Sequence, residues 1–175
     1  MSEAHRAKRA AQSEAVRRTQ DRKDALSRET REAVRSDYRE ILRFVTRTRL
    51  FVMVLRDRVS GFEAWSASVS DDSREVEDLE ARSEILRIRL LEELPDAQSL
   101  VGVWAPGSLL QVFDQIYNSG PDIRSRVTTA LHFKCDGDRS AEAFSGALEA
   151  IEHLLDLLNE ARGALLAAHL PPAVD

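Results

Sequence analysis

The sequence predicts an all-α protein: an antiparallel helical bundle of long, heptad-patterned helices with a basic N-terminal arm. Along two long segments, apolar residues recur at alternating spacings of three and four, the period of a helix that packs through one seam. The 175 residues include only 7 Gly and 5 Pro. Turns are therefore few, and we expect a small number of long helices rather than many short elements.

Residues 1–30 contain few large apolar side chains, with only Val16 and Leu26 after the first Met. They are rich in Ala, Arg, Gln and Glu, which favour helix by propensity but give it little to bury. We therefore expect a flexible or helical basic arm over 1–30, followed by a helical bundle over 31–170.

The first long helix is predicted at about 31–64. Its seam alternates spacings of four and three through Val34, Tyr38, Ile41, Val45, Thr48, Val52, Leu55, Val59 and Phe62. Other apolar residues, among them Leu50, Phe51 and Val54, widen this face. A wide face is typical of a helix that packs on more than one neighbour, which favours a bundle over a two-stranded coil.

Residues 66–73 are dominated by Ser and Asp, which compete with helix interiors and favour caps and turns. We expect the chain to reverse near residue 69 and a second helix to occupy about 73–94, ending before Pro95. Its apolar face is Val76, Leu79, Ile85, Leu86, Leu90 and Leu94. The alternative is one unbroken helix from 30 to 94.

Two short helices are predicted at about 108–118 and 121–133, because Ser119-Gly-Pro121 indicates a stop and a restart. The last long helix is predicted at about 140–169. Its seam again alternates four and three through Phe144, Leu148, Ile151, Leu155, Leu158, Arg162 and Leu165.

Composition excludes several classes of protein. A single Cys cannot form an internal disulfide or a Cys-rich zinc module. The longest strongly apolar run, Leu50–Leu55, is far shorter than the roughly 20 residues that cross a bilayer. We therefore expect a cytoplasmic protein that does not associate with membranes.

The net charge of −5 conceals a division along the chain. Residues 1–60 hold 16 Lys and Arg against 9 Asp and Glu, whereas residues 61–175 hold 9 against 21. Within the basic half, Arg35, Arg39, Arg43 and Arg47 recur at i,i+4 spacing, where like charges repel. A reversal near residue 69 would bring 39–47 opposite 91–99, so we expect Glu92, Glu93 and Asp96 to neutralise this row. An external anion or an acidic protein partner are the alternatives.

The two wide seams leave room for a further helix, which predicts a homodimer or a helical protein partner. The predicted interaction face comprises Arg35, Arg39, Arg43, Arg47, Phe51 and Arg162. Arg162 is included because it interrupts the seam of the last helix, where a charged residue can fix register.

Nucleic-acid binding is the alternative function, with contacts from Arg6, Lys8, Arg9, Arg17, Arg18, Arg124 and Arg126. The short helices around Gly120 have the outline of a helix-turn-helix. However, the arm carries many acids and no aromatic residues for base stacking, so this function is not favoured.

No catalytic or metal-binding pattern emerges. Cys135 and His132 lie three residues apart, but nothing in the sequence supplies an orienting group or an oxyanion hole. His132, Cys135, Asp136 and Asp138 lack a second pair of zinc ligands. We therefore expect no cofactor and no enzyme activity, and the sequence predicts an interaction or oligomerisation module that acts as an adaptor or assembly subunit.

Overall fold

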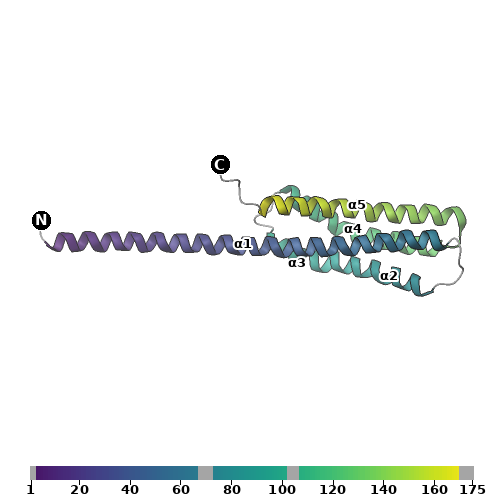
Figure 1. Cartoon of the computed structure of the whole chain (residues 1–175), viewed down its shortest axis with the longest axis horizontal. Coiled ribbons are helices and arrows are strands. Elements are labelled where there is room, and N and C mark those ends of the chain that lie inside the picture. Colours follow the sequence, from purple (N-terminus) through teal and green to yellow (C-terminus); the bar gives the residue numbers. More distant parts are fainter. Residues whose placement is uncertain (1–2, 67–72, 102–106, 170–175) are drawn as a thin grey trace. The chain divides into compact units, whose positions relative to one another are not determined.

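The computed structural model describes residues 3–66, 73–101 and 107–169, and every element in these ranges is helical (Figure 1). The elements are α1 (Glu3–Ser66), α2 (Ser73–Ile88), the π-helix η1 (Arg89–Glu93), α3 (Leu94–Val101), α4 (Gly107–His132) and α5 (Gly137–His169). The chain divides into two compact units, Met1–Ser36 and Asp37–Asp175. The predicted all-α bundle is confirmed for the described residues.

The first unit contains the N-terminal part of α1, which begins at Glu3 rather than near residue 31. Its described side chains are exposed, except for the half-buried Val34. Leu26, for example, is 57% exposed. This part of α1 therefore buries little apolar surface.

In the second unit, α1 and the segment that follows it run in opposite directions. The guanidinium of Arg89 in η1 lies over the ring of Phe51 in α1, 5.3 Å from its centroid. Residues on either side of the 67–72 segment therefore face each other, as the predicted reversal requires, and the unbroken helix from 30 to 94 is excluded. The predicted turn itself lies outside the described residues.

The other neighbours are also antiparallel. Between α1 and α5, Arg49 Nε donates to Asn159 Oδ1 at 2.6 Å, and the ring centroids of Phe62 and Phe144 lie 5.8 Å apart. Between α4 and α5, Arg126 Nη1 donates to the backbone carbonyl of Gly146 at 3.3 Å. α4 packs on α2 as well as on α5, so the helices enclose a common core.

The predicted seams form most of this core. In α1, the residues from Tyr38 to Phe62 that follow the four–three spacing are all buried. In α5, Arg162 is exposed and Ala161 is buried in its place, so the prediction that Arg162 lies in the seam is wrong. Leu158 and Leu165 of the predicted seam are buried on either side of it, so the buried face passes from Leu158 through Ala161 to Leu165.

Pro95 does not end the second helix as predicted. α2 passes into η1, whose wider turn joins Leu94 N–H to the carbonyl of Arg89, and α3 then continues to Val101. In a regular α-helix the proline ring would collide with the preceding turn. A π-turn immediately before Pro95 relieves that collision, so the helical path continues.

Ser119-Gly-Pro121 also fails to separate two helices, because α4 is continuous through Pro121. Gly120 is buried, and a Cβ atom there would lie 3.4 Å from both Arg87 Cα and Leu90 Cβ. The glycine thus marks the point where α2 and η1 approach α4 closely. Pro121 removes one backbone hydrogen bond, and α4 nevertheless continues through it beside the close packing at Gly120. The outline of a helix-turn-helix is therefore absent.

A tight connection at 133–136 joins α4 to α5. The carbonyl of Asp136 accepts hydrogen bonds from Arg139 N at 3.0 Å and from Ser140 N at 3.3 Å. These bonds satisfy donors in the first turn of α5. The helix consequently starts at Gly137, three residues before the predicted start at about 140.

Candidate functional site

The arginine row of α1 lies on the surface. Arg35, Arg39, Arg43 and Arg47 are all exposed, and within the described part of the chain none of them forms an ion pair. The expected neutralisation by Glu92, Glu93 and Asp96 does not take the form of direct pairs. Instead, Glu93 Oε2 lies 3.6 Å from Nε of Arg89, which belongs to η1 as well. The row therefore keeps its charge available at the surface.

The arginine row continues into exposed apolar residues. Arg39, Arg43, Arg47, Leu50 and Val54 follow spacings of 4, 4, 3 and 4, which place them on one face of α1. Leu50 is 54% exposed and Val54 is 46% exposed. We call these five residues the α1 row. The prediction that Leu50 and Val54 widen the buried face is wrong.

A second row, with the spacings of the α1 row in reverse order, runs along the opposing segment. Ala81, Ile85, Ile88, Glu92 and Asp96 follow spacings of 4, 3, 4 and 4 across α2, η1 and α3, and all are exposed. Ile85 is 46% exposed and Ile88 is 36% exposed, although Ile85 was predicted on the buried face. We call these residues the α2–α3 row. It combines apolar and acidic side chains where the α1 row combines apolar and basic ones.

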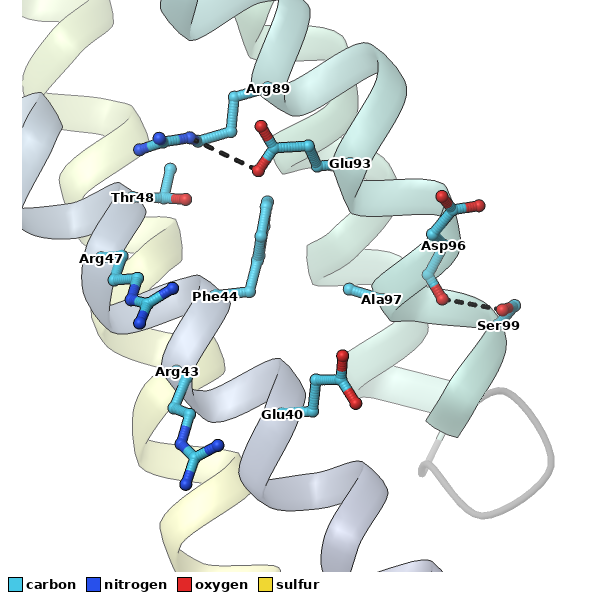
Figure 2. A pocket seen from close by; sticks show the side chains of 10 residues that line it. All are labelled: Glu40, Arg43, Phe44, Arg47, Thr48, Arg89, Glu93, Asp96, Ala97 and Ser99. Atoms are coloured by element: carbon cyan, nitrogen blue, oxygen red, sulfur yellow. Dashed lines mark hydrogen bonds and ion pairs between the residues drawn. The ribbon is translucent and has the colours of Figure 1, made fainter.

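A pocket of about 780 Å³ lies between the two rows (Figure 2). α1 contributes one wall and η1 with α3 the other; the lining residues are Glu40, Arg43, Phe44, Arg47, Thr48, Arg89, Glu93, Asp96, Ala97 and Ser99. Arg43 and Arg47 belong to the α1 row and Asp96 to the α2–α3 row, so the two rows border the same hollow. Its lining carries three guanidinium groups and three carboxylates.

Thr48 belongs to both the pocket lining and the core. Its side chain is fully buried, and its Oγ1 has no hydrogen-bond partner in the described part of the protein. A buried hydroxyl without a partner is energetically unfavourable. Because Thr48 lines the pocket, the pocket extends to the buried seam of α1.

The remaining predicted interaction residues lie in different places. Phe51 is half-buried beside the α1 row, and the guanidinium of Arg89 lies over its ring. Arg162 lies on α5, is exposed and does not line the pocket. The structure therefore brings Arg43, Arg47 and Phe51 to one surface and leaves Arg162 outside it.

Two of the predicted nucleic-acid contacts already have partners within the chain. Arg124 pairs with Glu84 of α2 and donates to Thr128 Oγ1 at 3.2 Å. Arg126 pairs with Asp122 at 2.9 Å. Arg17 is exposed, whereas the side chains of Arg6, Lys8, Arg9 and Arg18 lie outside the described ones. The described arginines of α4 thus serve packing between helices.

Glu84 of α2 forms an ion pair with Arg124 of α4. Its carboxylate accepts from Arg87 Nη2 at 2.6 Å and from Arg124 Nε. The hydrogen bonds from Arg87 and then Arg124 lower the pKa of Glu84 to about 2, and the same carboxylate raises the pKa of Arg87. This cluster therefore holds two helices together as charged partners.

The residues considered for catalysis and metal binding are dispersed on the surface. Cys135 is exposed, and the exposed His132 stacks edge-on against Phe133 with ring centroids 5.2 Å apart. Over the ranges that the structure describes, no three His, Cys, Asp or Glu side chains are grouped to hold a metal ion. None of the helices in those ranges is long and apolar enough to cross a membrane.

The spacing of the arginines in the α1 row continues from Arg47 to Leu50 and Val54, and this spacing is the sequence signal that would have placed Leu50 and Val54 on the exposed face. Similarity to other proteins adds no further indication. The chain matches no protein-family model, and no curated protein or solved structure is significantly similar to it.

Proposed function

We propose that this protein is a non-enzymatic interaction module that docks a helical protein partner on the surface formed by the α1 row and the α2–α3 row. The observation that carries this proposal is the exposure of Leu50, Val54, Ile85 and Ile88, at 36–54%, beside arginines that form no ion pair with any described residue. Exposed apolar side chains rimmed by charged residues are typical of protein interfaces.

The pocket between the rows supports docking of a protein more than binding of a small molecule. Small-molecule sites are mostly apolar and enclose most of their ligand. Here the lining is rich in charged groups of both signs, and Arg43, Arg47 and Asp96 are exposed at its edge. Such a lining suits a partner that presents a row of side chains along both rows.

Site-specific photo-crosslinking in the native cells tests this function. A photoreactive amino acid at Leu50 or Ile85 should give light-dependent protein adducts, because both side chains would be covered by the partner. Ala164 on α5 is exposed outside this surface and provides the control position. In the same experiment, Arg47→Glu should reduce the adduct formed at Leu50.

Two results would overturn the proposal. One is the absence of adducts at both Leu50 and Ile85. The other is an equal yield at Ala164, which would show that capture is not specific to the rows. Identification of the adduct by mass spectrometry distinguishes a second copy of the chain from a different protein.

A further inference from the structure

The two rows present their charges in matching order. Along α1, the basic residues Arg43 and Arg47 precede the apolar Leu50 and Val54, whereas along the opposing segment the apolar Ile85 and Ile88 precede Glu92 and Asp96. Because the segments are antiparallel, with Phe51 beside Arg89, the basic end of one row lies level with the acidic end of the other. The apolar ends are likewise level with each other.

A surface arranged in this way is complementary to itself. A half-turn about an axis that is parallel to α1 and lies above the line between the two rows brings the α1 row of one copy against the α2–α3 row of the other. The rotation leaves each residue at its own level along the axis. Basic residues then face acidic ones and apolar residues face apolar ones in both halves of the contact, which is the requirement for an isologous interface.

We propose that the partner docked on this surface is a second copy of the chain, in a two-fold dimer where Arg43 and Arg47 of each copy face Asp96 and Glu92 of the other. This inference rests on the proposed function and names its partner. The dimer covers Leu50, Val54, Ile85 and Ile88 in symmetric pairs of rows. It also closes the mouth of the pocket that reaches Thr48.

Other binding partners are complementary to only part of the charged and apolar residues on this surface. A purely acidic helix would pair with Arg43 and Arg47 but would meet Glu92 and Asp96 as like charges, which is unfavourable at an interface. A small anion would face the three carboxylates of the pocket lining and would leave the apolar residues exposed. A second copy supplies both signs of charge and an apolar strip in the required order.

Charge reversal with complementation tests the dimer. Arg43→Glu and Asp96→Arg are suitable because both side chains are exposed and neither forms an ion pair within the described part of the chain. In a dimer of either variant, both contacts between these positions bring like charges together. We expect at least about a tenfold weakening of dimerisation for each variant.

An equimolar mixture of the two variants provides the decisive measurement. In the mixed dimer, the two reversed residues face each other across one half of the interface and the two unaltered residues across the other. Sedimentation should therefore give about twice the 19.7 kDa chain mass for the wild type and the mixture, and about the chain mass for each variant alone. Pairing within one chain cannot restore association on mixing.

Control variants separate loss of the interface from loss of the fold. Arg162→Glu changes an exposed arginine on α5 and should leave the dimer intact. Ile85→Lys introduces a charge into the apolar strip at an exposed position. This variant should sediment as a monomer and keep the helical circular dichroism of the wild type. The test therefore does not depend on the folding of either charge-reversal variant.

A wild-type chain that stays monomeric at high concentration would overturn the dimer. If Leu50 then captures a different protein by photo-crosslinking, the proposed function stands without it. A wild-type dimer that Arg43→Glu, Asp96→Arg and Ile85→Lys all leave intact, or a mixture that fails to reassociate, would show that the copies do not meet through these rows.

Discussion

Replacing Thr48 with Val should stabilise the protein. Thr48 is fully buried, and its Oγ1 lacks a hydrogen-bond partner within the described residues. Both side chains branch at Cβ and restrict the helix backbone similarly, so the substitution mainly exchanges a hydroxyl for a methyl group. An unsatisfied buried polar group costs about 1–3 kcal/mol. We expect Thr48→Val to raise the free energy of unfolding by about 1 kcal/mol, the lower end of that range.

Urea unfolding followed by far-ultraviolet circular dichroism measures this effect. The midpoint should move to higher urea concentration while the slope of the transition stays unchanged, because the surface exposed on unfolding is nearly the same. Thr129→Val is the matched control. Thr129 is exposed and its hydroxyl donates to the carbonyl of Ser125 at 2.9 Å, so its replacement should change stability by less than about 0.5 kcal/mol.

A lower free energy of unfolding for Thr48→Val would refute the reasoning. It would mean that the Thr48 hydroxyl is satisfied in the folded protein, for instance by water in the adjoining pocket. The pocket reaches Thr48, so this outcome has a definite structural meaning.

The remaining predictions address the core, the crossing of α2 and α4, and the partly exposed ion cluster at Glu84. Phe144→Ala should lower the free energy of unfolding by about 3–5 kcal/mol in urea titrations, because the ring is 1% exposed. Leu166→Ala, at a 38% exposed position, should cost less than about 1 kcal/mol. Gly120→Ala should gain up to about 1 kcal/mol of helix propensity, since its Cβ would meet the backbone of Arg87 at 3.4 Å, an ordinary contact. Gly120→Leu should instead lose about 1–3 kcal/mol, and equal melting temperatures for the two would contradict the close crossing. The lowered pKa of Glu84 stabilises the fold above pH 4.5, and this contribution disappears as the pH falls toward 2. Glu84→Gln should therefore flatten the decline of melting temperature in that interval, and parallel pH profiles for the two proteins would argue against the cluster.

The sequence predicts the long helices well because their seams are sustained signals. The four–three spacing of α1 persists from Tyr38 to Phe62, and every residue in that series is buried. The predicted ends at Pro95 and Pro121 are wrong for a tertiary reason. The helix continues through Pro95 because a π-turn precedes it. It continues through Pro121 where Gly120 packs against residues that are distant in sequence.

The sequence predicts which residues of the candidate site lie opposite each other along the helices. It does not predict which side of each helix faces solvent. The expected reversal correctly places Arg43 and Arg47 opposite Glu93 and Asp96, and all four line one pocket. The arginines nevertheless form no ion pairs with these acids, because their positions on α1 face outward. Which side of a helix faces outward depends on where its neighbours pack, and spacing along one segment does not contain that information.

The order of the helices in space has a consequence for folding kinetics. α2 and α4 are neighbours, as are α4 and α5, so much of the core forms by joining segments that are close in the chain. The contact between α1 and α5 is different, since Arg49 and Asn159 are 110 residues apart. Among the contacts described above, this one closes the longest loop and carries the largest loop-closure entropy. We therefore expect the seam between α1 and α5 to form late in folding, and a tether between the two helices there should accelerate folding.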